Sequence, residues 1–86
     1  MNRRAQWRKV LEREVARWSA MPVPQILEEA GDVAAYEVEL DSQTYQVEVQ
    51  IIEDTEEYLH VTVGVDDGSL PASMLPATQT FLCRKH

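Results

Sequence analysis

Apolar and polar residues alternate through three consecutive runs between positions 34 and 66, and this alternation is the clearest pattern in the chain. Such alternation is typical of strands that bury one face and expose the other. It predicts three antiparallel strands over 34–41, 44–52 and 57–66, joined as a meander. The residues on the predicted apolar face are Tyr36, Val38 and Leu40 in the first strand, Tyr45, Val47, Val49 and Ile51 in the second, and Leu59, Val61, Val63 and Val65 in the third.

A fourth strand is predicted over 78–84, beside the third, with Phe81 and Cys83 expected on its apolar side. Before it, the Asp-Asp-Gly-Ser sequence at 66–69 is a turn signal. Residues 70–77 contain two prolines and no regular period, so we predict an ordered connection there.

The pairing of the first two strands depends on the turn between them. A two-residue turn over Ser42 and Gln43 would set Leu40 opposite Tyr45 and Glu37 opposite Glu48. Because Ser-Gln is a poor sequence for a tight turn, a four-residue loop is an alternative that leaves the same side chains on each face.

Two helices are predicted before the sheet. Over 2–20, apolar residues recur every three or four positions, which is typical of an amphipathic helix that covers an apolar sheet face. Pro22 and Pro24 end this helix, and Pro24 can begin a short second helix over 24–30 that stops at Gly31. The apolar stripe of the first helix consists of Trp7, Val10, Leu11, Val15 and Trp18.

These elements predict one α+β domain over residues 1–86, in which a long N-terminal helix packs on a four-stranded antiparallel meander sheet. This order of elements resembles cystatin-like and related small α+β folds. The resemblance is one of architecture, extends loosely over the whole chain, and implies no activity.

Opposite charges are segregated along the chain, which has a net charge of -7. Six of the eight Lys and Arg residues lie in the first seventeen positions, whereas thirteen of the fifteen carboxylates lie between Trp18 and Cys83, where there is no Lys or Arg. The sequence therefore predicts a basic helix attached to an acidic sheet. The basic helix alone would favour nucleic acid, but the acidic remainder would repel a phosphate backbone, and we expect no nucleic-acid partner.

We expect a cytoplasmic protein without a membrane partner. The chain contains no apolar run approaching the roughly 18–20 residues that cross a bilayer, and charges interrupt its N-terminus throughout. The single cysteine, Cys83, is expected to be a small buried residue of the last strand rather than a reactive thiol.

Carboxylates are the only plentiful reactive groups. Glu37, Glu39 and Glu48 are predicted on the polar sheet face, with His60 on the same face opposite Gln50. Such groups can act as acid and base or hold a divalent ion, but an open sheet surface provides neither a cleft nor supporting ligands. We therefore predict no catalytic residue, no cofactor and no metal ligand.

The function expected from these features is a small non-catalytic protein-interaction module that self-associates, with a homodimer as one form. Glu37, Glu39, Glu48 and His60 are its candidate interaction face. The alternative is a small-ligand-binding or enzyme-like domain with a pocket between helix and sheet, lined by Trp7, Trp18 and Tyr36. Two tryptophans on an apolar stripe favour core packing over a ligand site.

Overall fold

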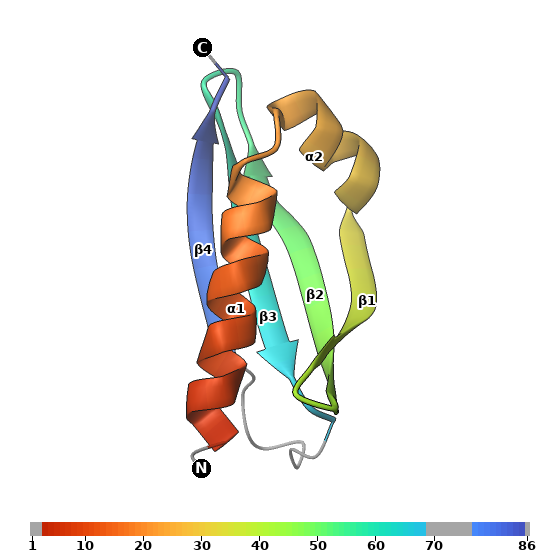
Figure 1. The fold of residues 1–86 in the computed structure, drawn as a ribbon. Coiled ribbons are helices and arrows are strands. Elements are labelled where there is room, and N and C mark those ends of the chain that lie inside the picture. Colours follow the sequence, from red (N-terminus) through yellow and green to blue (C-terminus); the bar gives the residue numbers. More distant parts are fainter. Residues whose placement is uncertain (1–2, 69–76, 86) are drawn as a thin grey trace.

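The computed structural model describes residues 3–68 and 77–85, and it has the α+β architecture predicted from the sequence (Figure 1). Two helices precede a four-stranded antiparallel sheet in the meander order β1-β2-β3-β4. The connection predicted over 70–77 lies outside the described residues except for Ala77, which begins the last strand. The elements are α1 (Arg3–Ser19), α2 (Val23–Ala30), β1 (Val33–Leu40), β2 (Gln43–Asp54), β3 (Tyr58–Asp66) and β4 (Ala77–Arg84).

Helix α1 lies along β3 and β4 and covers the inner face of the sheet on that side (Figure 1). Its predicted stripe is buried: Trp7, Val10, Leu11 and Trp18 all belong to the core, and Val15 packs against it. Glu14 is buried with them. Within the described residues, no helix is long and apolar enough to cross a membrane.

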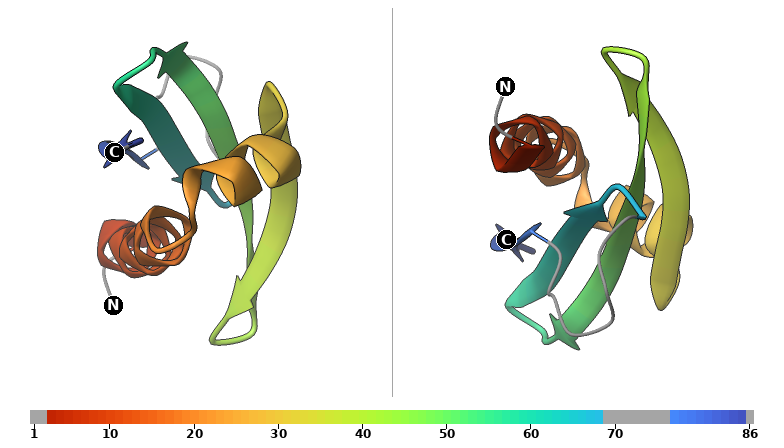
Figure 2. Two further views of the ribbon diagram at one scale, coloured as in Figure 1. Left: turned by 90° about the horizontal axis from the view of Figure 1, so that it is seen from above. Right: turned by 90° about the horizontal axis from the view of Figure 1, so that it is seen from below.

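Helix α2 packs against β1 and β2, on the part of the inner face that α1 leaves uncovered (Figure 2). Its first turn uses the carbonyl oxygen of Pro22, which accepts hydrogen bonds from the amides of Gln25 and Ile26. Gly31 ends it in the left-handed region at φ 55°, and its amide donates to the Leu27 carbonyl oxygen at 3.1 Å. A side chain at this φ would be strained, which explains why glycine stops the helix here.

The inner face of the sheet carries the core, as the alternation predicted. Tyr45, Val47 and Val49 of β2 are buried together with four residues of β3, which are Leu59, Val61, Val63 and Val65. On β4, Phe81 and Cys83 face this core, whereas Leu82 points outward, so the predicted facing of this strand is confirmed. Burial raises the pKa of the Cys83 thiol, as expected for a packed cysteine.

The predicted pairing of β1 with β2 is wrong by two residues. The turn is Asp41-Ser42, with φ 51° and 65°, and it sets Leu40 opposite Gln43 and Glu37 opposite Gln46 rather than Glu48. Two consecutive residues with positive φ match the twist of the flanking strands, and this geometry outweighs the poor turn propensity of serine. A shift of two residues keeps every side chain on its predicted face, so the error in register does not change which residues face the core.

Strand β2 is longer than predicted because it continues past an irregularity. The pairing with β3 shifts between Ile51 and Glu53, which makes Ile52 the extra residue of a β-bulge. Beyond it, Glu53 lies opposite His60 and Asp54 lies opposite Leu59. His60 therefore does not face Gln50 as predicted, because Gln50 pairs with Thr62.

Candidate functional site

The outer face of the sheet is hollowed by a groove that runs across its strands. One hollow of about 320 Å³ lies over β1 and β2, and an adjoining hollow of about 220 Å³ lies over β2, β3 and the start of β4. Glu48 and Asp66 line both hollows, so we treat them as one outer-face groove. Its outward-facing residues are Glu37, Gln46, Glu48, Gln50, Thr62, Gly64, Asp66 and Thr78.

Three carboxylates from three neighbouring strands line the groove. Glu37 of β1 and Asp66 of β3 pair with Gln46 of β2 from opposite sides, and Glu48 lies two residues farther along β2. Strands about 4.8 Å apart place the backbones of β1 and β3 roughly 10 Å from each other, so the carboxylates gather in one region. Within the described residues, Glu37 and Glu48 form no ion pair. The groove therefore presents uncompensated negative charge.

Only part of the predicted interaction face lies in this groove. Glu37 and Glu48 line it, whereas Glu39 pairs with Thr44 near the β1–β2 turn. His60 is four residues along β3 from Gly64, a separation of about 13 Å. Sequence reasoning placed Asp66 at the end of the third strand, where the turn signal begins, and did not include it among the site residues. Asp66 has the same parity as Thr62, and its Oδ1 also accepts a hydrogen bond from the Gly68 amide at 2.8 Å.

The floor of the groove contains Gly64, which lines its second hollow. Gly64 lies opposite Glu48 on β2 and opposite Thr78 on β4. A Cβ atom at this position would meet the Thr78 Cγ2 atom at 3.5 Å, which is ordinary contact, so packing does not require glycine here. Glycine weakens a strand interior and often marks a close approach of another chain or ligand.

Metal binding is not indicated by the described part of the chain, where no group of three His, Cys, Asp or Glu side chains is placed to hold an ion. The groove carboxylates come from an open sheet surface without supporting ligands. Their arrangement suits the attraction of cations on a partner rather than the coordination of an ion.

The hollows found among the described residues do not bring the three residues of the alternative pocket together. Trp7 and Trp18 are both buried, but they lie eleven residues apart on α1, or roughly 16 Å at 1.5 Å per residue. Trp18 contacts Tyr36, with ring centroids 6.4 Å apart. Trp7 instead lines a separate hollow of about 240 Å³ with Arg8, Leu11, Ala77 and Thr78.

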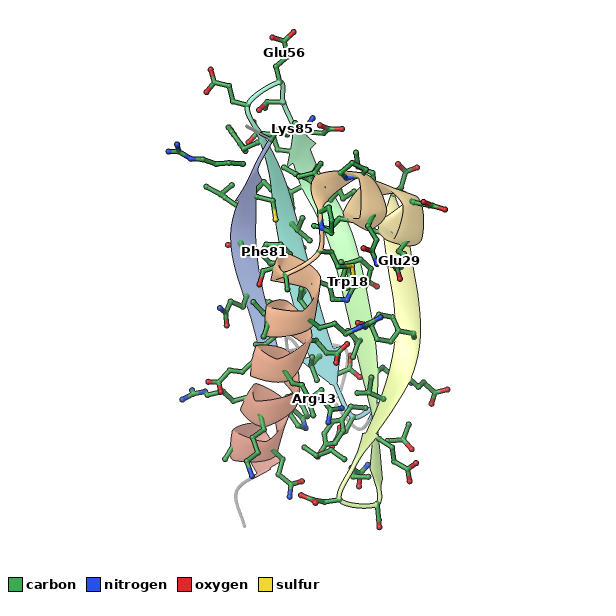
Figure 3. All side chains as sticks on the ribbon, turned by 45° about the horizontal axis from the view of Figure 1, so that its top comes forward. Arg13, Trp18, Glu29, Glu56, Phe81 and Lys85 are labelled. Carbon is green, nitrogen blue, oxygen red and sulfur yellow. The ribbon has the colours of Figure 1, made fainter. Side chains whose placement is uncertain are left out.

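A partly buried polar network joins α1 to β1 on the inner face, around Trp18 (Figure 3). The Tyr36 hydroxyl donates to Glu14 Oε1 at 2.5 Å and accepts from Trp18 Nε1 at 2.7 Å. Arg17 donates to Glu14 Oε1 and to the Tyr36 hydroxyl, both at 3.2 Å, and its guanidinium lies over the rings of Trp18 and Tyr36. This network compensates the burial of Glu14, which is only 3% exposed.

The sequence contains a signal for this network, which is the position of Glu14. Glu14 follows Trp7 and Leu11 and precedes Trp18 at spacings of seven, three and four residues, so it lies on the buried stripe itself. A carboxylate on such a stripe requires buried donors. Tyr36, at the inner face of an adjacent strand, supplies one of them.

The network should be visible in the alkaline titration of the protein. Burial, followed by the hydrogen bond to Glu14, raises the pKa of Tyr36 from 10.0 to about 12. Since the folded protein retains this proton longer than the unfolded chain, the contribution to stability is complete below pH 10 and is lost as the pH rises toward 12. Ultraviolet difference spectroscopy should show a tyrosine ionisation step near pH 12, and Tyr36→Phe should remove that step. A wild-type titration without this step, or one that Tyr36→Phe leaves unchanged, would contradict the network.

The chain matches no protein-family model, no curated protein and no solved structure.

Proposed function

We propose that this protein is a small non-catalytic interaction module that binds a basic segment of a partner protein in the outer-face groove and that also self-associates. The observation that carries the proposal is the groove itself, where Glu37, Glu48 and Asp66 from three strands line one hollow. Carboxylates in such an arrangement suit arginine, whose planar guanidinium pairs with them through two parallel hydrogen bonds.

The basic helix does not neutralise this groove within the chain. Helix α1 lies on the inner face of the sheet, and its Arg13 and Arg17 pair with Glu14 there. The two charged surfaces thus lie on opposite sides of the sheet, which leaves the groove open to a basic segment from another molecule. An exposed pair contributes about 0.2–1 kcal/mol, so we expect weak, salt-dependent binding.

The remaining parts of the proposal follow the same reasoning. The helix-on-sheet layout is consistent with the cystatin-like outline, and the single cysteine is consistent with a cytoplasmic location. Neither feature implies an activity. The packing of Trp7 and Trp18 into the core favours the interaction module over the small-ligand alternative.

Binding of a fluorescently labelled oligoarginine peptide tests the proposal. Anisotropy at about 50 mM and about 500 mM salt spans Debye lengths of about 14 Å and about 4 Å, and binding should fall sharply at the higher salt. Glu48→Gln should raise the dissociation constant about 2- to 5-fold at low salt. The matched control is Glu28→Gln, which removes the same charge from an exposed position of α2 and should have a smaller effect. Equal effects of both changes would mean that only net charge matters and would overturn the proposal that the peptide binds in the groove.

The variant Gly64→Ala distinguishes an effect on peptide binding in the groove from an effect on the stability of the fold. Alanine should stabilise the strand by about 0.5–1 kcal/mol, because the backbone here needs no glycine and the new Cβ fits. The same methyl group raises the floor of the groove and should weaken peptide binding. Urea denaturation and anisotropy on one preparation measure both effects, and unchanged binding would show that the partner does not approach this floor.

A further inference from the structure

Strand β1 forms one edge of the sheet, because the strand order is β1-β2-β3-β4. Figure 2 shows it at one side of the molecule, whereas β4 at the other edge lies beside α1. The edge extends over the eight residues of Val33–Leu40 and contains no proline, and its pairing with β2 runs without a register shift. Strand β1 therefore lacks the short length, the proline or the bulge with which edge strands commonly prevent the addition of another strand.

The pairing of β1 with β2 determines which backbone groups point outward at this edge. The Ile51 amide donates to the Asp32 carbonyl oxygen at 3.4 Å, just before β1 begins. Since hydrogen-bonded pairs alternate along two antiparallel strands, the even-numbered residues of β1 bond to β2, up to Leu40 at the two-residue turn. The odd-numbered residues direct their N–H and C=O groups away from β2. These residues are Val33, Ala35, Glu37 and Glu39.

The side chains along the edge form an acidic face and an apolar face. Glu37 and Glu39 are exposed on the outer face, and Glu37 lines the groove together with Glu48. On the inner face, Val38 and Leu40 pack against the core but are only partly buried. An added strand in the plane of the sheet alternates in the same way. Every second side chain of such a strand lies beside the carboxylates, and the others lie beside apolar residues.

We propose that the basic segment of the partner binds as a fifth strand along β1, with basic side chains alternating with apolar ones. Its main chain hydrogen-bonds to the open edge. Its basic side chains face Glu37 and Glu39 and extend over the groove, while its apolar side chains continue the inner face beside Val38 and Leu40. This inference rests on the proposed function and adds the conformation and the sequence pattern of the bound segment.

Charge favours a basic segment over other strands at this edge. A second copy of β1, added about a two-fold axis, brings its own Glu37 and Glu39 onto the same outer face, where like charges repel. The β4 edge suits a basic segment less well, because β4 contains no carboxylate and ends at Arg84. The two glutamates thus discourage a like strand and attract a cationic one.

A pair of N-methylated peptides tests this inference. The parent peptide alternates Arg and Val over about eight residues, the length of β1, and its binding is measured by anisotropy at about 50 mM salt. An added strand turns the amides of alternate residues toward β1 and the others toward solvent. One isomer is therefore methylated at the Arg amides and the other at the Val amides. One of them should bind about tenfold or more weakly than the parent, because methylation removes its donors and obstructs β1, and the other should bind within about twofold.

The two isomers have the same composition and charge, so each is the control for the other. Equal affinities would overturn the inference, and salt-dependent binding of both would leave the proposed function in place. A protein that binds no basic peptide at low salt would overturn both.

Hydrogen exchange measured by NMR locates the added strand on the protein. In the free protein, the outward amides of Ala35, Glu37 and Glu39 should exchange rapidly, and saturation with the parent peptide should slow them about tenfold or more. Shifts of the Glu48 and Gly64 amides without slower exchange along β1 would mean that the peptide binds in the groove through side chains alone. That result would overturn the inference and would retain the groove.

The variant Ala35→Pro removes one outward amide of β1 and leaves every carboxylate in place. It should raise the dissociation constant of the parent peptide about 5- to 10-fold. The matched control is Thr80→Pro at the β4 edge, where the Lys85 amide bonds to the Glu57 carbonyl oxygen and the even-numbered residues therefore face away from β3. This control should change binding by less than about twofold. Circular dichroism confirms that both variants are folded, and equal effects of the two prolines would contradict an added strand at β1.

Discussion

Replacing Trp18 with alanine is expected to cost about 3–5 kcal/mol of stability, the range for deletion of a large buried aromatic side chain. Trp18 is only 2% exposed, packs on Tyr36, and donates its indole N–H to the Tyr36 hydroxyl. The loss combines a cavity between helix and sheet with the loss of the hydrogen bond from the indole N–H to the Tyr36 hydroxyl. Since domains of this size have little stability in reserve, the variant should be largely unfolded at 25 °C by circular dichroism.

The matched control for this change is Leu82→Ala, which truncates a large apolar residue at an exposed position. It should alter the unfolding free energy by no more than about 0.5 kcal/mol when measured on the monomer at low concentration. A folded Trp18→Ala protein with a similar small loss would mean that the helix-to-sheet core is not packed as described.

Removing the Tyr36 hydroxyl with Tyr36→Phe is expected to cost about 2–4 kcal/mol. Two buried partners lose their hydrogen bonds at once: the Glu14 carboxylate loses a donor and the Trp18 indole N–H loses its acceptor. Each buried group left unsatisfied costs about 1–3 kcal/mol, although Arg17 continues to satisfy part of Glu14. Urea denaturation with an unchanged slope measures the loss.

Tyr45→Phe is the control for the Tyr36 prediction. Tyr45 also reaches from the sheet to α1, but its hydroxyl donates only to Gln6 Oε1 at 2.8 Å, and that bond is partly exposed. We expect a loss of about 0.5–1.5 kcal/mol for it. In addition, Glu14→Gln and Tyr36→Phe should be non-additive in a double-mutant cycle, because they belong to one network. Equal losses for the two tyrosine variants, with additive cycles, would show that the network does not contribute as proposed.

Most of the fold follows from short-range patterns. The alternation through β1, β2 and β3 fixes which side chains face inward, and the proline pair at 22 and 24 fixes the break between the helices. The register of β1 with β2 does not follow from such patterns, because it depends on the positive φ angles of Asp41 and Ser42. Neither residue signals such a turn as clearly as Asn-Gly does. The bulge at Ile52 likewise arises from the pairing of two strands and has no local sequence marker.

The candidate site was predicted only in part, again because the register of the strands could not be predicted. Glu37 and Glu48 were assigned to the correct face by parity alone, but the position of each along the sheet depends on register, so His60 proved distant from them. Asp66 and Glu14 were not predicted as functional or network residues, because local sequence does not show which residues they contact. Their roles arise from contacts between elements, with Gln46 across the sheet and with Tyr36 across the core.

The central claim is that the outer face binds a partner while the inner face is a filled core, and an NMR titration of the labelled protein with the oligoarginine peptide tests it most directly. The predicted result is that amide signals of Gln46, Glu48 and Gly64 shift with peptide concentration, while the indole N–H signals of Trp7 and Trp18 do not move. Shifts of the indole signals with unperturbed groove amides would place binding between helix and sheet and would contradict the account.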